Sequence, residues 1–191
     1  MSDVTSLIAP LFVPANRPDR FAKAVASGAD AVILDLEDAV PPDAKEDARD
    51  QLRNLAINKP VIVRINGLNT PWHEDDCTTL KSIAVAAIML PKAERIEDLA
   101  RLQQIAPVIA LIETAQGLAD IRTIAQSGTA TRLAFGSVDY AADIGCEHTS
   151  QALYAARAEL VLASRLGNLP PPIDGVTLDL QSETEVRKDA Q

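Results

Sequence analysis

The sequence contains few of several residue types that mark large classes of protein. Its 191 residues include only two cysteines, Cys77 and Cys146, and only 3% aromatic residues. The cysteines are far apart and have no metal-ligand spacing, so we expect two free thiols in a cytoplasmic protein. The aromatic side chains are too few for a surface on which nucleic-acid bases stack. No apolar run is long enough to cross a bilayer, and the first residues lack the pattern of a signal segment.

Basic residues are also in the minority. Lysine and arginine together number 18, against 27 aspartate and glutamate residues, which gives a formal net charge of −9. No basic cluster marks a surface for nucleic acid or for an anionic membrane, so we expect neither as a partner. With 47% hydrophobic residues, the chain can bury a sizeable core. These features predict one globular domain over residues 1–191 that acts on small molecules.

Short apolar runs alternate with segments of helical spacing. The runs that predict strands are Leu7–Pro14, Ala31–Leu36, Pro60–Ile65, Ala86–Leu90, Val108–Ile112, Arg132–Phe135 and Val176–Leu180. The segments that predict helices are Arg17–Ser27, Asp43–Ile57, Glu74–Ile83, Ile96–Ile105, Ala115–Gln126 and Ser150–Leu166. Because the strand runs show no polar alternation, we expect a parallel sheet that is buried on both faces, with helices outside it.

The predicted strand ends recur every 21 to 29 residues, at Pro14, Glu37, Asn66, Lys92, Glu113 and Ser137. This period favours a (β/α)₈ barrel. An open doubly wound sheet is the weaker alternative, because the turn after the first run, 13–17, lacks the glycines of a nucleotide-binding loop. Complete barrels typically need about 250 residues, and an eighth strand is missing. We therefore expect either an unclosed barrel or a chain that is part of a longer one.

Two acidic residues follow neighbouring strands of this predicted sheet. Glu113 comes directly after the fifth run, and Asp139 comes shortly after the sixth. Since parallel strands end at the same edge of a sheet, both carboxylates can lie on one rim. Mg²⁺ usually takes one or two carboxylates and leaves its other positions to water and substrate. The sequence thus predicts a metal site, with the alternative that each acid caps the helix after it.

Two more charged residues occupy predicted strand ends. Strand alternation places Asp35 and Glu37 on one face, and Glu37 is the likelier rim group and a candidate base. Arg64 carries a planar fork that matches a carboxylate. We interpret Arg64 as a substrate-binding residue, with a structural ion pair to a group such as Glu37 as the alternative.

Weaker signals come from the loops. Gly136 and Ser137 allow close backbone approach and could hold a substrate carboxylate, or form an ordinary turn. Arg17 lies near the start of a helix, where it could hold a phosphate or remain a solvated surface residue. His73 and His148 have neither metal spacing nor a partnered nucleophile, so we interpret both as surface or helix-start residues.

Six motifs, in this order, resemble the citrate lyase β-subunit and malyl-CoA lyase-like family of C–C lyases, within the HpcH/HpaI aldolase superfamily. They are Leu11-Phe12-Val13-Pro14, Asp35-Leu36-Glu37-Asp38, Arg64-Ile65-Asn66, Leu90-Pro91-Lys92, Ile112-Glu113-Thr114 and Phe135-Gly136-Ser137-Val138-Asp139. The resemblance spans Leu11 to about Asp179. It implies a (β/α)₈ TIM barrel of the phosphoenolpyruvate/pyruvate type, usually a homo-oligomer such as a trimer or hexamer. It also implies an enzyme that binds Mg²⁺ and cleaves or forms 3-hydroxyacyl-CoA thioesters, such as citryl-CoA, malyl-CoA or citramalyl-CoA, to give an acyl-CoA and a 2-keto acid.

The resemblance also implies roles for particular residues. Glu113 and Asp139 would be the metal ligands, and Arg64 would hold the carboxylate of the keto acid. The segment Pro172-Ile173-Asp174-Gly175 resembles the family's segment near the nucleotide of coenzyme A, with Arg17 near its phosphates.

The sequence departs from the family pattern at its end. Family members continue through another strand and a C-terminal lid that brings a catalytic acid to a neighbouring subunit, and nothing after Asp179 matches that portion. We therefore expect that the last βα unit and the lid are missing from this chain and that the catalytic base is unassigned. Two other functions stay open: a coenzyme A-independent class II pyruvate aldolase, and a non-catalytic subunit.

Overall fold

The computed structural model describes residues 4–55, 57–179 and 181–189. It has an α/β fold around a six-stranded parallel sheet in the order β1-β2-β3-β4-β5-β6, so that consecutive strands are neighbours. The strands are β1 Leu11–Pro14, β2 Val32–Asp35, β3 Val61–Arg64, β4 Ala87–Leu90, β5 Val108–Ile112 and β6 Arg132–Phe135. The parallel sheet and its first six strands confirm the sequence prediction. No pairing between β1 and β6 occurs in the described ranges, so barrel closure stays a prediction.

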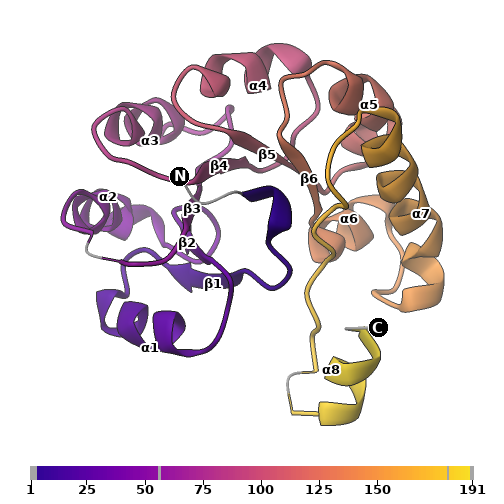
Figure 1. Ribbon diagram of the computed structural model, residues 1–191, viewed down its shortest axis with the longest axis horizontal. Helices are drawn as coiled ribbons and strands as arrows, with labels where there is room; N and C mark the ends of the chain where they lie inside the picture. The colour runs from indigo at the N-terminus through magenta and orange to yellow at the C-terminus, as the bar shows by residue number, and fades with distance from the viewer. Residues whose placement is uncertain (1–3, 56, 180, 190–191) are drawn as a thin grey trace.

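Helices connect the strands and lie outside the curved sheet (Figure 1). The α-helices are α1 Phe21–Ala26, α2 Lys45–Arg53, α3 His73–Leu80, α4 Ile96–Gln103, α5 Ala115–Gln126, α6 Ser137–Ile144, α7 Ser150–Leu166 and α8 Glu183–Asp189. Three short 3₁₀ helices, Val4–Ser6, Pro18–Arg20 and Pro42–Ala44, precede β1, α1 and α2. The predicted helices Ala115–Gln126 and Ser150–Leu166 have the same bounds as α5 and α7, whereas α6 and α8 were not predicted. None of the helices in the part that the structure describes is long and apolar enough to cross a membrane.

Alternating strand residues build two hydrophobic clusters. One face packs against the surrounding helices and includes Leu34, Val63 and Leu90. The other face lines the inside of the curve and includes Ile33, Ile62, Met89 and Ile109. Both faces are apolar because the sheet is covered on both sides, which explains why the strand runs show no polar alternation.

The N-terminal segment fills part of the inner face. Val4 and Leu7 are buried in the inner cluster. Arg132, at the start of β6, donates hydrogen bonds to the carbonyl oxygens of Val4 and Leu7 at 3.0 and 2.8 Å, and to that of Pro171 at 2.8 Å. One buried guanidinium therefore ties two segments, far apart in the sequence, to β6.

The predicted first strand is too long at its start. Strand β1 begins at Leu11, and residues Leu7 to Ala9 are outside it. The amides of Ile8 and Ala9 donate to the carboxylate of Asp30 at 2.8 and 2.9 Å instead of to a neighbouring strand. The Asp30 side chain thus replaces the backbone hydrogen bonds that a neighbouring strand would make at this point.

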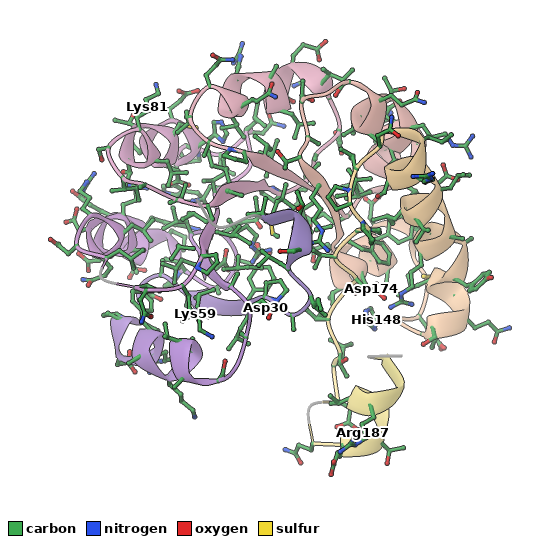
Figure 2. The ribbon with its side chains drawn as sticks, in the orientation of Figure 1. Asp30, Lys59, Lys81, His148, Asp174 and Arg187 are labelled. Atoms are coloured by element: carbon green, nitrogen blue, oxygen red, sulfur yellow. The ribbon has the colours of Figure 1, made fainter. Side chains whose placement is uncertain are left out.

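The predicted seventh strand, Val176–Leu180, is wrong over residues 176–179, and Leu180 lies outside the described residues. The chain instead meets β6 earlier, through one isolated parallel bridge between Ile173 and Ala134. Prolines 170–172 supply no amide hydrogen for a ladder, and Val176 and Leu178 are exposed. Side chains fill the space between sheet and helices, whereas α8 with Arg187 lies beyond the sheet and its helices (Figure 2).

Candidate active site

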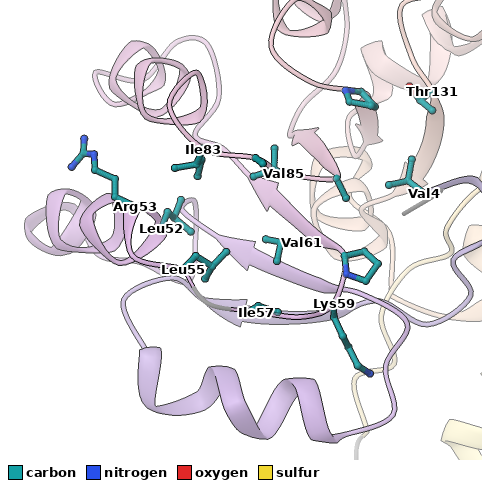
Figure 3. A pocket seen from close by; sticks show the side chains of 14 residues that line it. Val4, Leu52, Arg53, Leu55, Ile57, Lys59, Val61, Ile83, Val85 and Thr131 are labelled. Atoms are coloured by element: carbon teal, nitrogen blue, oxygen red, sulfur yellow. The ribbon is translucent and has the colours of Figure 1, made fainter. Parts of the chain in front are cut away.

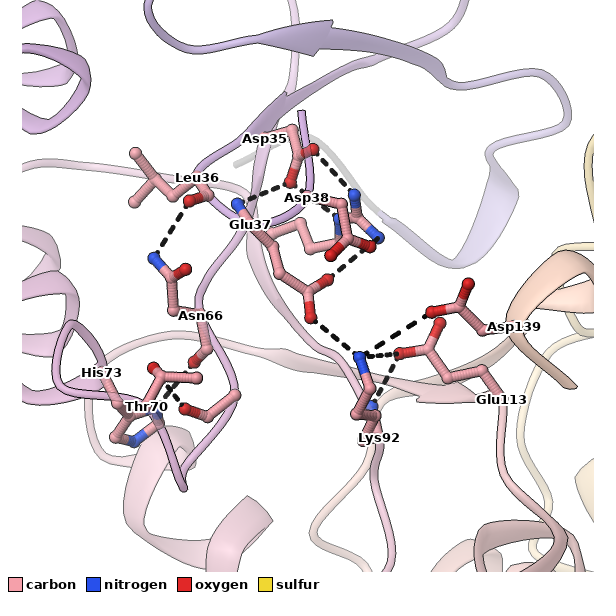
Figure 4. A network of polar contacts seen from close by, with 12 residues as sticks. Asp35, Leu36, Glu37, Asp38, Asn66, Thr70, His73, Lys92, Glu113 and Asp139 are labelled. Carbon is pink, nitrogen blue, oxygen red and sulfur yellow. Dashed lines mark hydrogen bonds and ion pairs between the residues drawn. The ribbon is translucent and has the colours of Figure 1, made fainter. Parts of the chain in front are cut away.

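Charged side chains from successive strands converge at the carboxyl end of the sheet (Figure 4). They come from the end of β2, the end of β3, the turns after β4 and β5, and the first turn of α6: Asp35, Glu37, Arg64, Lys92, Glu113 and Asp139. The structure therefore brings together Glu37, Arg64, Glu113 and Asp139, which the sequence singled out. Their chemical roles stay predictions.

Glu113 is, after Asp35, the most deeply buried carboxylate of this cluster, and is 2% exposed. The backbone amide of Lys92 donates to Glu113 Oε1 at 2.9 Å. A Cβ atom on Gly136 would lie 2.3 Å from Glu113 Oε2, so a glycine is needed where α6 begins. Burial, and next the nearby carboxylate of Glu37, raise the pKa of Glu113 to about 7.

Neither acid caps the following helix. Helix α5 is capped by Thr114, whose side chain accepts a hydrogen bond from the Gly117 amide at 3.0 Å. Helix α6 begins after Gly136 with no side-chain cap, and Asp139 lies in its first turn. Asp139 is 40% exposed and faces the cluster. The helix-cap alternative is therefore wrong for both residues.

Lys92 joins the carboxylates. Its Nζ lies 3.1 Å from Glu37 Oε1, 3.7 Å from Asp139 Oδ2 and 3.9 Å from Glu113 Oε1. Burial lowers the pKa of Lys92, but the surrounding carboxylates outweigh burial and raise it overall. The sequence placed Lys92 at a strand end without giving it a role.

The main partner of Arg64 is Asp35, and Glu37 makes a further contact with Arg64. Its Nε and Nη2 donate to the two oxygens of Asp35, both at 2.7 Å. Its Nη1 lies 3.0 Å from Glu37 Oε2, so the predicted ion pair with Glu37 is also present. Nη1 also lies 3.5 Å from Asp38 Oδ2, so of the five N–H bonds of the guanidinium only one, on Nη2, has no carboxylate partner among these contacts.

Glu37 is buried between the two cations. Burial raises the pKa of the Glu37 carboxyl, while Arg64 and Lys92 act in the opposite direction. Its place beside both cations supports the prediction that Glu37 faces the rim.

A second polar layer, which the sequence analysis missed, holds the ends of β2 and β3. Buried Lys45 donates to the carbonyl oxygens of Leu36 and Glu37 at 2.6 and 2.7 Å, and to Asn66 Oδ1 at 2.7 Å. His73 is buried at the start of α3, not on the surface, and contacts the Asn66 carbonyl at 2.8 Å. A lysine on an amphipathic helix carries no sequence signal for such a role.

Ser137 and His148 form a pair that the sequence did not predict. His148 Nε2 lies 2.9 Å from Ser137 Oγ. Ser137 is buried, and a Cβ atom on Gly175 would lie 2.1 Å from its Oγ. Because the Gly175 backbone covers the hydroxyl, the pair connects three segments and does not present an open nucleophile.

The residues expected near coenzyme A are at the surface and paired locally. Arg17 binds Asp19 through Nε and Nη2 at 2.9 and 2.7 Å. Asp174 binds Arg157 Nε at 2.9 Å, directly after the Ile173 bridge to β6. Pro172 precedes this bridge and is partly buried.

A separate pocket of about 740 Å³ lies at the opposite end of the sheet (Figure 3). It is lined by residues at or before the starts of β3 to β6, including Val61, Ala86, Pro107 and Thr131. None of the predicted site residues lines this pocket, so it is distinct from the candidate site.

The rim can hold a cation with only two ligands from the protein. Among the residues that the structure describes, no three His, Cys, Asp or Glu side chains form a complete metal cage. Glu113 and Asp139 provide two carboxylates around one ammonium, and Mg²⁺ commonly accepts such a pair. The donor set therefore fits a hard divalent cation whose other ligands are water and substrate.

Comparisons with known proteins identify the family of this chain. The HpcH/HpaI aldolase/citrate lyase family matches residues 9–191. A citrate lyase subunit beta-like protein of Mycobacterium tuberculosis is 37% identical, over 95% of this chain and 68% of the relative. An L-malyl-CoA/beta-methylmalyl-CoA lyase of Cereibacter sphaeroides is 31% identical, over 95% of this chain and 70% of the relative.

A solved structure of CitE from Mycobacterium tuberculosis in complex with magnesium, acetoacetate and coenzyme A has a TM-score of 0.87 and 33% identity, over 97% of this chain and 72% of that chain. These matches confirm the resemblance that the six motifs indicated. The chain therefore belongs to the HpcH/HpaI aldolase/citrate lyase family and is by family a carbon–carbon lyase.

Proposed function

We propose that this chain is a Mg²⁺-dependent lyase that cleaves or forms 3-hydroxyacyl-CoA thioesters, giving an acyl-CoA and a 2-keto acid. The observation that carries the proposal is the convergence of Glu113 and Asp139 beside Arg64 on one rim. The names of the relatives, and the magnesium and coenzyme A bound to the similar CitE structure, support the same chemistry.

Glu113 and Asp139 would hold the metal. The Lys92 amide fixes one oxygen of Glu113, and close packing on Gly136 fixes the other, so this carboxylate is positioned before a ligand arrives. When bound, Mg²⁺ supplies Lewis acidity at the substrate's carboxylate and adjacent oxygen.

Arg64 and the start of α6 would orient the keto acid. The remaining N–H bond on Arg64 Nη2 can bind its carboxylate, and the Ser137 amide at the start of α6 offers a further donor. The Gly136 amide already donates to the Ile112 carbonyl at 2.9 Å, so Gly136 would contribute through the close backbone approach that it allows. Asp35 keeps the guanidinium in place through two hydrogen bonds, so little rotational freedom is lost when substrate binds.

Glu37 is our candidate for the acid–base group. Its raised pKa makes proton uptake easier than for a solvated glutamate. Lys92 and Arg64 contact its two oxygens and hold the carboxyl at the rim.

Arg17 and residues 172–174 would bind the coenzyme A portion. The charged groups of both regions lie at the surface, where Arg17 forms an ion pair with exposed Asp19 and Asp174 forms one with partly exposed Arg157. Such pairs contribute little stability, so Arg17 can exchange Asp19 for a ligand phosphate, and Asp174 can exchange Arg157 for a hydrogen-bond donor of the ligand.

We also propose that the protein is a cytoplasmic homo-oligomer, a trimer or hexamer, with a TIM-type barrel that a further βα unit completes. Exposed apolar side chains on α7, which are Tyr154, Val161, Leu162 and Leu166, support self-association. Light scattering on the purified protein tests the oligomeric state.

The experiment that tests the function is incubation of the pure protein with a panel of 3-hydroxyacyl-CoA thioesters and Mg²⁺, followed by mass spectrometry. We expect an acyl-CoA and a 2-keto acid in equal amounts, and no products with Glu113→Gln. Free coenzyme A with an intact hydroxy acid would indicate thioester hydrolysis instead of C–C cleavage. Turnover of free hydroxy keto acids without any affinity for coenzyme A would support the aldolase alternative and contradict the proposal.

A further inference from the structure

Lys92 occupies the centre of the predicted metal site. Its ammonium is the group that Glu113 and Asp139 both face, at 3.9 and 3.7 Å, and it contacts Glu37 at 3.1 Å (Figure 4). The side chain is nevertheless 49% exposed, so it can leave this position without unfolding the protein.

The backbone that carries Lys92 is fixed. Lys92 has a positive φ of 48°, and its amide is bound to Glu113. The next amide, that of Ala93, donates to the Leu111 carbonyl at 3.2 Å. A Cβ atom on Gly117 would lie 2.8 Å from the Ala93 carbonyl oxygen, so α5 also packs tightly on this turn. Only the flexible side chain of Lys92, and not the turn, can therefore move.

The Lys92 ammonium and a divalent cation would compete for the carboxylates of Glu113 and Asp139. A divalent cation held by Glu113 and Asp139 would need the space beside their carboxylates that the Lys92 ammonium occupies. Two positive groups a few ångströms apart in a partly buried site repel strongly. Without either cation, the buried carboxylates of Glu37 and Glu113 repel each other, which is unfavourable.

We propose that Lys92 is a positioning residue that acts as an internal counter-ion: it neutralises the carboxylate cluster in the metal-free protein and is displaced when the metal binds. Its side chain thereby lowers the metal affinity and keeps the cluster assembled between metal-binding events. The proposal rests on the assignment of Glu113 and Asp139 as metal ligands.

Titration of Mg²⁺ into metal-free protein, followed by calorimetry at about pH 8.5 to limit competition by protons, tests the proposal. Lys92→Met removes the ammonium but keeps the backbone amide that binds Glu113, and methionine faces the same positive φ as lysine. We expect Lys92→Met to bind Mg²⁺ about tenfold or more tightly than the parent. Lys92→Arg keeps the competing charge and should bind no more tightly than the parent.

Arg95→Met is the matched control, because it also removes one positive charge from the connection between β4 and α4. Arg95 is exposed and pairs with Asp98 at 3.1 Å, away from the cluster. We expect its Mg²⁺ affinity to stay within about twofold of the parent.

The melting temperature gives a second readout that does not depend on turnover. In the presence of a chelator, Lys92→Met should melt below the parent, and saturating Mg²⁺ should raise its melting temperature more than that of the parent. An unchanged or weaker affinity of Lys92→Met, in a protein whose Glu113→Gln variant loses Mg²⁺, would overturn the counter-ion role alone. Unchanged Mg²⁺ binding by Glu113→Gln would overturn the metal site itself.

Discussion

At the scale of single residues, the site depends on a carboxyl group in an unusual environment. Glu113 is buried against Gly136 and close to Glu37, and its pKa is raised to about 7. A glutamate with a raised pKa in the folded state binds a proton more tightly there than in the unfolded chain. Its stabilising effect is complete below the unfolded value of 4.5 and is lost as the pH rises through about 7.

Glu113→Gln should therefore change how stability depends on pH. In metal-free protein, the parent should lose on the order of 2 kcal/mol more unfolding free energy than Glu113→Gln between about pH 5.5 and pH 8. Urea unfolding at several pH values measures this difference. All of these pH values lie above the pI, where the net charge of the protein limits its self-association. Parallel pH profiles for the two proteins would show that Glu113 is an ordinary, solvated carboxyl group.

The sequence singled out Glu113, Asp139, Arg64 and Glu37, and named Glu37 as an alternative partner of Arg64, but it did not predict the contacts made by Asp35 and Lys92. Strand order and alternation determine which end and which face a residue occupies. They do not determine contacts across strands, so the binding of Arg64 by Asp35 and the position of Lys92 among the carboxylates are seen only in the structure.

At the scale of the elements, the start of α6 fixes the site. Gly136 is required because any Cβ atom there would collide with Glu113. In the sequence, Gly136 and Ser137 indicate an ordinary turn or a ligand-binding turn, and nothing indicates the eight-residue helix that begins at Ser137. No charged cap or long apolar repeat marks so short a helix.

Gly136→Ala should displace the Glu113 carboxylate from its position. We expect Mg²⁺ affinity to fall about tenfold or more and stability to fall by about 1–3 kcal/mol, because the added methyl group overpacks a filled site. Calorimetry and urea unfolding measure the two effects.

Gly67→Ala is the control, since its added Cβ would meet only Pro91 Cγ at an ordinary 4.0 Å. Mg²⁺ affinity in Gly136→Ala equal to that of Gly67→Ala would contradict the packing role of Gly136.

At the scale of the whole molecule, the parallel sheet followed from the alternation of apolar runs and helical segments. The sequence could not predict how the inner face is filled, because Arg132 joins to β6 two segments that lie far from it in the sequence, the N-terminal segment and the residues near Pro171. The predicted seventh strand failed for a related reason: an apolar run with exposed side chains, Val176 and Leu178, resembles a strand in sequence but has no partner in the described part of the sheet.

Arg132→Leu tests how much this buried tie contributes. The substitution leaves three carbonyl oxygens without their donor, so we expect a loss of about 2–4 kcal/mol in unfolding free energy. Arg122→Leu, which breaks the surface pair with Glu159, should cost clearly less, because exposed ion pairs contribute little to stability. Equal losses in urea unfolding would show that the N-terminal segment is held by other contacts.

The central claim is that Glu113 and Asp139 hold the metal on which turnover depends. The most direct measurement is Mg²⁺ titration by calorimetry into the parent, Glu113→Gln and Asp139→Asn, with circular dichroism to confirm that all three are folded. The account predicts that both variants keep the fold, bind Mg²⁺ at least about tenfold more weakly and lose turnover of hydroxyacyl-CoA thioesters. Two folded variants that bind Mg²⁺ as tightly as the parent would contradict it.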